Sequence, residues 1–350
     1  MVRKSIILIL VIVVAALTVS ALVSAQEAPD VVVEGLNNPR HIRLSEDGTL
    51  YVAEAGLGGE TEVTGPFGPA LAGLSAQISA FDADGEATIV LPELVSMDAG
   101  FGQVEGVTDI YVTESAYWVV FGLGPQEAAF EDKYVESVIQ IDRASGDVWE
   151  ALDLRAFEAE NNPDAAEEIV SNPINLGVDA EGTLYIVDAS ANSVLTWTIS
   201  DGLKLFAAWE VTDETPSAVP TAVAFSPEGD VYIGFLSGFP FPAGGARIER
   251  YSADGELLET YEGLTLVTDL HVAEDGTLYA VEMASGFGDT GYIADSGRIV
   301  TVSTEGIEVV AEGLNIPYGM AIEADGNLLV TVNSAFNAPD SGMVVRLAME

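Results

Sequence analysis

The chain has 350 residues, of which 56 are Asp or Glu and 12 are Lys or Arg, and its formal net charge is −44. A field of this sign repels nucleic acids and anionic lipid surfaces, so we expect neither as a partner. Cysteine is absent, which excludes disulfides and thiol chemistry. Hydrophobic residues make up 49% of the chain, enough for a packed core, and the 35 glycines with many Val, Ile and Thr favour strands.

The first 25 residues have the features of a secretory signal peptide. Arg3 and Lys4 precede an apolar run, 5–23, and Val23-Ser24-Ala25 suits cleavage after Ala25. We therefore expect a mature domain, 26–350, that is secreted or periplasmic and has no membrane contact after cleavage. The alternative is an uncleaved anchor, because residues 5–26 carry no charge and are long enough to span a bilayer.

One sequence unit recurs along the rest of the chain. Its first copy, 35–55, predicts a strand at 41–45, a tight turn at Glu46-Asp47-Gly48 and a second strand at 49–55. Further copies occupy 172–190, 219–237, 267–285 and 316–334, and a degenerate copy occupies 107–122. The turn positions lie 67, 67, 47, 47 and 50 residues apart, at Gly48, Ser115, Gly182, Gly229, Gly276 and Gly326. Periods near 40–50 residues are typical of β-propellers.

A second strand pair follows each of the first five copies, around Gly85, Gly146, Gly202, Gly255 and Gly306. Each unit then has four strands, the content of one propeller blade. The sixth unit has three strands, and Val31–Glu34 resembles the strand that ends the other units. We predict that this segment completes the last blade. The predicted fold is all-β: a single six-bladed β-propeller closed by an N-terminal strand.

The long insertions between strands should emerge on one face, which we call the loop face. They are 56–76, 122–136, 191–192, 238–245, 284–296 and 335–341. Converging loops make this the expected binding surface. The link 155–171 contains helix formers and Asn162-Pro163, and we predict a short helix near 162–169.

Two phenylalanines, Phe239 and Phe241, are held by two prolines in the loop 238–245. On the loop face, they indicate contact with an aromatic or hydrophobic ligand. The equally simple alternative is a loop that folds its own rings over the channel.

The residues that open the first strand of each unit should face the central channel. In alignment they are His41, Asp109, Asn175, Ala222, Asp269 and Gly319, with Arg40 and Tyr318 beside them. Asp109, Asn175 and Asp269 offer the oxygen ligands that Ca²⁺ prefers, so a calcium ion in the channel is one hypothesis. The other is that these side chains cap loop backbone.

Carboxylates end the second strands of the first, third and fifth units, at Glu54, Asp188 and Glu282. Such acids can bind a ligand or serve as acid and base, although 56 acids make coincidence easy. The candidate ligand-binding residues are therefore Arg40, His41, Glu54, Asp188, Phe239, Phe241, Glu282 and Tyr318. No sequence motif of a serine hydrolase or zinc protease is present, and no catalytic residue is assigned.

Four segments are distinctive: GLNNPRHIRLSEDGTLYVAEAG, the FEAENNPD link, IPYGMAIEADGNLLVTV and the GFPFP loop with its flanking strands. Together they resemble the ScyD/ScyE family of secreted propeller proteins. The resemblance spans about residues 30–347, and its departures are the degenerate second unit and SNPINLGVD in the third. It implies an exported propeller with no established catalytic residues. The family is named for the gene cluster of an extracellular cyanobacterial pigment, scytonemin, but its members also occur in bacteria without that pigment.

Two functional hypotheses follow from these observations. The first is a monomeric, non-catalytic propeller that binds an unknown small molecule or protein on its loop face. The alternative is an enzyme similar to gluconolactonase and strictosidine synthase, a lactonase or esterase-like hydrolase that uses a divalent cation in the channel.

Overall fold

The computed structural model describes residues 29–65, 68–100, 102–130, 133–212, 217–289 and 291–349. The predicted signal peptide, 1–25, lies outside these residues. Within the described ranges, no helix is long and apolar enough to cross a membrane.

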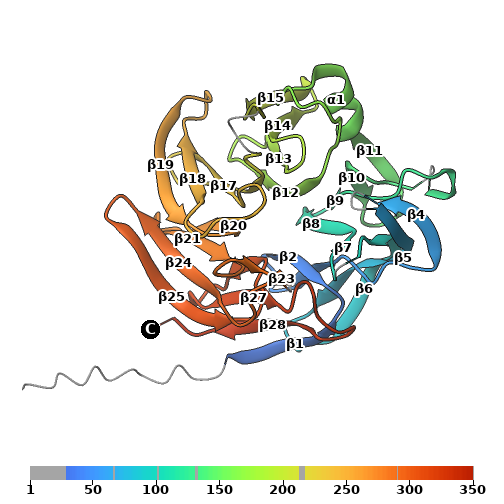
Figure 1. The fold of residues 1–350 in the computed structure, drawn as a ribbon. Coiled ribbons are helices and arrows are strands. Elements are labelled where there is room, and N and C mark those ends of the chain that lie inside the picture. The colour runs from blue at the N-terminus through green and yellow to red at the C-terminus, as the bar shows by residue number, and fades with distance from the viewer. Residues whose placement is uncertain are drawn as a thin grey trace, which may run out of the picture.

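Six antiparallel sheets of four or more strands form a ring (Figure 1). Each innermost strand contacts the innermost strands of the two neighbouring sheets, which closes the ring. These strands are β2 (Pro39–Leu44), β8 (Val107–Val112), β12 (Pro173–Val178), β16 (Pro220–Phe225), β20 (Val267–Val272) and β26 (Met320–Ile322). The all-β propeller predicted from the repeat is confirmed.

The remaining strands complete each sheet outward from the ring centre. The first sheet adds β3 (Leu50–Glu54), β5 (Gly68–Phe81), β6 (Ala87–Asp98) and β7 (Val104–Glu105), and β4 (Thr61–Gly65) pairs with β5. The second adds β9 (Ala116–Phe121), β10 (Ser137–Asp142) and β11 (Val148–Asp153), and the third adds β13 (Leu184–Asp188), β14 (Ser193–Thr198) and β15 (Gly202–Ala208). The fourth adds β17 (Val231–Phe235), β18 (Ala246–Tyr251) and β19 (Leu257–Leu264), and the fifth adds β21 (Leu278–Glu282), β24 (Gly297–Ser303) and β25 (Gly306–Leu314).

The sixth sheet joins the two ends of the described chain. It contains β27 (Leu328–Val332), β28 (Gly342–Leu347) and, at its outer edge, β1 (Asp30–Leu36). β1 runs antiparallel to β28, with Asp30 opposite Arg346 and Leu36 opposite Gly342. The predicted closure by an N-terminal strand is therefore confirmed.

The Asp-Gly turns have the local geometry that the repeat predicts. In the first sheet Gly48 has a φ of +84°, and its N–H donates to the carbonyl of Ser45 at 2.9 Å. Asp47 accepts from the Ser45 hydroxyl at 2.7 Å and from the Thr49 N–H at 3.0 Å. These hydrogen bonds lower the pKa of Asp47 to about 2. The turn is thus specified by its own residues.

The core lies between adjacent sheets. Between the first and second sheets, Tyr51 and Ile78 pack against Val119 and Ile139 in one buried cluster. The second strands β3, β9, β13, β17 and β27 are therefore buried along their whole length, which explains why their sequences are nearly continuously apolar rather than alternating.

The predicted helix near 162–169 is wrong in position. The helix α1 is Leu154–Asn161, and Asp153 caps its N-terminus by accepting from the Ala156 N–H at 2.8 Å. Asn162 adopts a left-handed conformation with φ of 40° and ends the helix. The Asn-Pro pair is thus its stop signal rather than its start.

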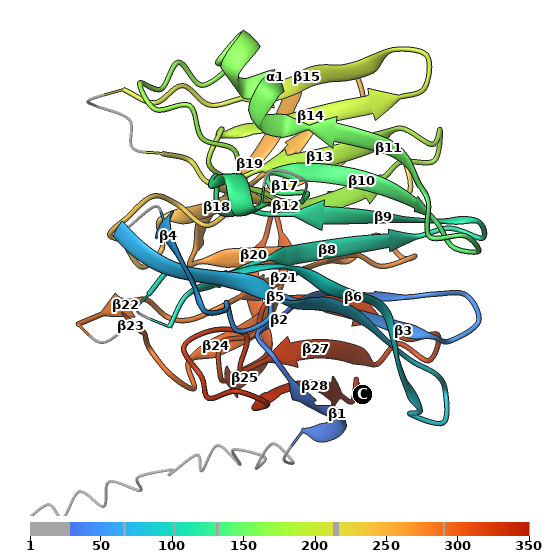
Figure 2. The same cartoon turned by 90° about the vertical axis from the view of Figure 1, so that its right-hand side faces the viewer.

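Two of the predicted loops contain strands. The segment 56–76 contributes β4 and the first half of β5, and 284–296 contains the hairpin of β22 (Phe287–Gly288) and β23 (Gly291–Tyr292). A short 3₁₀ turn, Ala128–Phe130, lies in 122–136. In the side view, β4 and the β22–β23 hairpin extend toward the same side of the molecule, the loop face (Figure 2).

Candidate functional site on the loop face

His41 lies inside the channel and connects three sheets. Its side chain is fully buried, and its Nδ1 lies 3.0 Å from the carbonyl oxygen of Thr108. Its Nε2 lies 3.2 Å from the carbonyl oxygen of Thr268 and 3.8 Å from Oδ1 of Asp269. Both ring nitrogens therefore face acceptor oxygens of other sheets. The imidazole bridges the channel and is not presented to solvent.

Asp109 is buried, and protein donors occupy its carboxylate. Oδ2 accepts from Nη2 of Arg43 at 2.5 Å, from Nδ2 of Asn175 at 3.0 Å and from the Leu176 N–H at 3.0 Å. Oδ1 accepts from the Ile110 N–H at 2.8 Å. The guanidinium and the neutral donors make this a well-compensated buried charge.

The other two residues of the proposed calcium site make similar bonds to the next sheet. Oδ1 of Asn175 accepts from the Val223 N–H at 2.9 Å, and Oδ2 of Asp269 accepts from the Met320 N–H at 2.8 Å. Burial raises the pKa of Asp269 from its ordinary value, and the nearby His41 acts in the opposite direction. These side chains link neighbouring innermost strands.

This arrangement does not fit a channel calcium ion. The oxygens of Asp109, Asn175 and Asp269 point to donors of neighbouring sheets rather than to one common point. Among the residues that the structure describes, no three His, Asp or Glu side chains are placed to hold a metal ion. The bonding is closer to the capping alternative, although the groups capped belong to the adjacent innermost strand and not to a loop.

The three carboxylates at the ends of the second strands each accept a hydrogen bond from a backbone N–H that lies just before the first strand of the same sheet. The N–H of Asn37 donates to Glu54 at 2.8 Å, that of Asn172 to Asp188 at 2.7 Å and that of Thr265 to Glu282 at 2.5 Å. Glu54 also accepts from Nε2 of Gln77 at 2.8 Å and from Oγ of Ser79 at 2.5 Å, and Glu282 pairs with Arg298. All three are buried, and burial raises the pKa of Asp188. Their bonds are those of structural groups.

An aromatic cluster covers part of the loop face. It consists of Phe239, Phe241, Phe287, Tyr292 and Phe336. Ring centroids are 5.8 Å apart for Phe239 and Phe241, 5.6 Å for Phe241 and Phe287, 5.0 Å for Phe287 and Tyr292, and 5.3 Å for Tyr292 and Phe336. All four contacts are edge-to-face, the favoured geometry for aromatic pairs. Phe239 is 73% exposed, so the cluster presents an aromatic ring to solvent.

The aromatic cluster continues inward to the channel mouth. Phe241, Tyr292 and Phe336 pack with Tyr318 against one buried apolar group that includes Met283. The Tyr318 ring then contacts His41 edge-on at 5.1 Å and lies 5.0 Å from the guanidinium carbon of Arg40. Burial raises the pKa of Tyr318 to about 12, so its phenol is neutral at physiological pH.

Five of the predicted ligand-binding residues therefore belong to one continuous region. They are Arg40, His41, Phe239, Phe241 and Tyr318. Glu54, Asp188 and Glu282 have the separate structural bonds described above. Phe287, Tyr292 and Phe336 were missed, and their signal was the presence of aromatic residues in the insertions 284–296 and 335–341.

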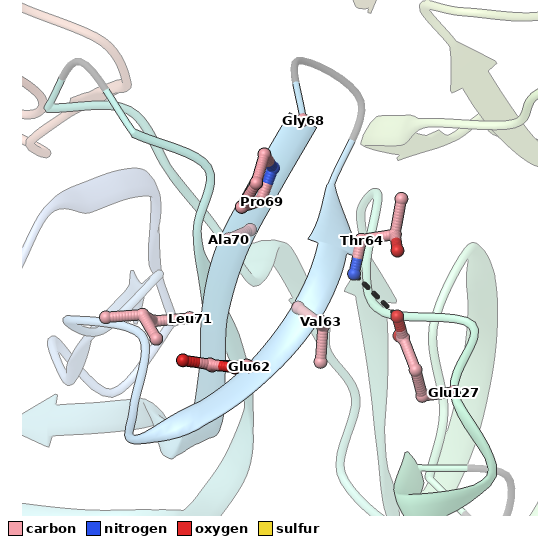
Figure 3. A pocket seen from close by; sticks show the side chains of 8 residues that line it. All are labelled: Glu62, Val63, Thr64, Gly68, Pro69, Ala70, Leu71 and Glu127. Carbon is pink, nitrogen blue, oxygen red and sulfur yellow. Dashed lines mark hydrogen bonds between the residues drawn. The ribbon is translucent and has the colours of Figure 1, made fainter.

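Two hollows on the surface lie elsewhere. One, of about 560 Å³, is lined by the β4–β5 hairpin and Glu127, whose Oε1 accepts from the Thr64 N–H at 2.5 Å (Figure 3). The other, of about 490 Å³, is lined by Gly244–Arg247, Glu262 and Gly263. Neither is lined by residues of the aromatic cluster.

The fold and this face define a β-propeller with an aromatic loop surface. The sequence matches no protein-family model and no curated protein. Among solved structures the chain is similar to a gluconolactonase from Xanthomonas campestris, with a TM-score of 0.55 and 12% identity over 91% of this chain and 89% of that chain. It is also similar to regucalcin, a calcium-binding protein from Agrobacterium tumefaciens, with a TM-score of 0.54 and 14% identity over 92% of this chain and 94% of that chain. At identities this low the similarity shows the fold alone.

Proposed function

We propose that this protein is an exported, ScyD/ScyE-like propeller that binds a neutral or cationic aromatic group on its loop face without catalysing a reaction. The observation that carries the proposal is the aromatic cluster, whose Phe239 is 73% exposed although its ring contacts those of Phe241 and Phe287. Phe287, which contacts Phe239, is also exposed, and contiguous exposed apolar groups mark interaction sites whereas isolated ones do not. The net charge of −44 disfavours an anionic ligand.

Covering Phe239 would provide a useful part of the binding energy. An aromatic side chain offers about 150–250 Å² of surface. With roughly three quarters of it exposed, complete burial at ~25 cal/mol per Å² contributes about 3–5 kcal/mol before the costs of association. Such a surface suits moderate affinity for an aromatic molecule or for an aromatic side chain of a partner protein.

The hydrolase alternative has less support from the site. A channel-bound cation would require Asp109, Asn175 and Asp269 to release the hydrogen bonds that link the sheets. Breaking such buried bonds leaves unpaired groups and costs about 1–3 kcal/mol each. The similarity to a gluconolactonase concerns the fold and supplies no catalytic residue.

The binding proposal is tested by titrating the purified protein with N-phenyl-1-naphthylamine, a neutral aromatic fluorophore. We expect saturable binding that is weakened about tenfold or more in Phe239→Ala. The matched control is Ile199→Ala, which removes a 93% exposed apolar side chain away from the cluster and should leave the affinity unchanged. Equal binding by Phe239→Ala and the wild type would overturn the proposal.

Catalysis and export are tested separately. Lactone and ester hydrolysis, assayed with and without added divalent cations, should remain at the background rate; a rate that depends on Asp269 would favour the hydrolase. Export predicts that mass spectrometry of the protein recovered outside the cytoplasm gives a chain that begins at Gln26. A chain that retains residues 1–25 would indicate the anchored form.

A further inference from the structure

A group of buried acids lies where the second sheet connects to the third. Glu136, Glu158, Asp164 and Asp188 are each no more than 1% exposed. Arg155 pairs with Glu136, its Nη1 lying 3.0 Å from Oε2. Asp164 is instead held by two neutral donors, Nδ2 of Asn192 at 2.9 Å and the Ala166 N–H at 3.0 Å. Burying this much negative charge is costly unless a cation or proton compensates it.

Glu158 differs from the other three acids because its carboxylate has no donor. Among the described residues, neither Oε1 nor Oε2 of Glu158 has a hydrogen-bond partner, although both atoms are buried. The same is true of Oδ1 of Asn162. Buried polar atoms are almost always paired. Three acceptor oxygens within five residues of chain therefore keep lone pairs that a cation could coordinate.

Glu158 and Asn162 lie one helical turn apart at the end of α1. The N–H of Asn162 donates to the carbonyl of Glu158 at 2.7 Å, so both residues lie at the C-terminal turn of the helix. Nδ2 of Asn162 donates to the carbonyl of Ala166 at 3.0 Å, and the Ala166 N–H donates to Asp164. The turn thus folds the side chains of Asn162 and Asp164 around Ala166, beside the negative end of the helix dipole.

Electrostatics agree with this placement. Burial, followed by the charges of Asp164 and Asp188, raises the pKa of Glu158 to about 7. A cation beside the Glu158 carboxylate would offset both the burial of its charge and the repulsion from these acids.

We propose that Glu158, Asn162 and Asp164 bind a calcium ion at the C-terminal end of α1. A carboxylate with both oxygens unpaired, an amide oxygen and the remaining lone pairs of a second carboxylate form the hard oxygen donor set that Ca²⁺ prefers. The set contains two acids, and among the described residues no group of three or more His, Asp or Glu side chains is placed to hold a metal ion. This site is separate from the channel, because its residues lie on the link between β11 and β12.

The proposal is tested by calorimetric titration of the purified, chelator-treated protein with CaCl₂ at 0.3 M NaCl, which screens the acidic surface. We expect one saturable site, and a melting temperature that rises with calcium. Glu158→Gln should reduce the affinity at least tenfold and abolish the rise in melting temperature. Glu168→Gln, an exposed acid on the same link, is the matched control and should behave as wild type.

Two further variants distinguish this site from the channel acids and from a general loss of folding. Asn162→Gly keeps the left-handed backbone of the helix end but removes Oδ1, so it should weaken calcium binding without unfolding the protein. Asp269→Asn changes a channel carboxylate and should leave the affinity unchanged. No saturable binding in wild type, equal binding by Glu158→Gln, or loss of binding only in Asp269→Asn would each overturn the proposal.

Discussion

Removal of β1 should lower the stability of the whole ring, because this strand supplies the outer edge of the sixth sheet. Val33 and Leu36 of β1 are buried, with 6% and 3% of their surface exposed, and pack with Ile42 and Val344. Each such side chain contributes about 1.5–3 kcal/mol through burial. Deleting Asp30–Leu36 should therefore lower the free energy of unfolding by about 3–6 kcal/mol.

The assay compares two chains by thermal unfolding monitored with circular dichroism. One begins at Asp30 and the other at Asn37, so that they differ only in β1. With a shift of about 2 °C per kcal/mol in a domain of this size, the shorter chain should melt about 6–12 °C lower. It should also aggregate more readily, because the edge of β28 loses its partner.

A point substitution separates lost packing from a truncation artefact. Leu36→Ala in the longer chain should lower the free energy of unfolding by about 2–5 kcal/mol. If the two chains melt within about 1 °C of each other, the N-terminal strand does not hold the ring together and the closure argument is refuted.

Three further predictions concern the channel and the loop face. Asp109→Ala removes the acceptor of the half-buried Arg43 guanidinium, of the Asn175 amide and of two backbone N–H groups, and should cost about 3 kcal/mol in denaturant unfolding. A loss below ~1 kcal/mol would contradict this bonding. Gly319→Ala places a Cβ 2.5 Å from Cα of His41 and should cost about 1–3 kcal/mol or more, whereas Gly288→Ala, with 3.8 Å of clearance, should be nearly neutral. Burial raises the pKa of Glu136 from its ordinary value of 4.5 to about 7 in the folded state. Between these two pH values the folded state binds more protons than the unfolded state, so the free energy of unfolding should fall as pH rises. Glu136→Gln should flatten that slope, and denaturant titrations at pH 5 and pH 8 measure it; an unchanged slope would assign the effect to another group.

The position of the single helix illustrates where sequence patterns were ambiguous. Asp153 is both the last residue of β11 and the N-cap of α1, so the start signal lies inside a strand. Asn162 and Pro163 occur at both kinds of helix end, and the chain uses them as the stop. The local sequence pattern therefore predicted that this link contains a helix, but it did not determine where the helix begins and ends.

The candidate site shows a similar division. Alignment of the repeats placed His41, Asp109 and Asp269 at the channel, because equivalent positions of a repeat occupy equivalent places in a ring. Their bonding partners could not be deduced, since Arg43 reaches Asp109 from 66 residues earlier in the chain. The calcium hypothesis treated the oxygens of Asp109, Asn175 and Asp269 as available ligands, because the hydrogen-bond donors that neighbouring sheets supply to them cannot be read from the sequence.

By itself, the sequence determined the all-β propeller and its turns, because hairpins and their repeat spacing are local properties that each segment encodes independently. It also determined the N-terminal closure, because the sixth unit lacks a fourth strand and the segment before the first unit resembles one. Only the tertiary structure decided which side chains meet. Phe239, Phe287 and Phe336 come from three separate insertions, and the ring brings the first two side chains within 6.2 Å of each other, measured between ring centroids. The lone carboxylate of Glu158 likewise became visible only when burial and hydrogen bonding were known. Contacts between distant segments depend on the closed ring, and no local pattern records them.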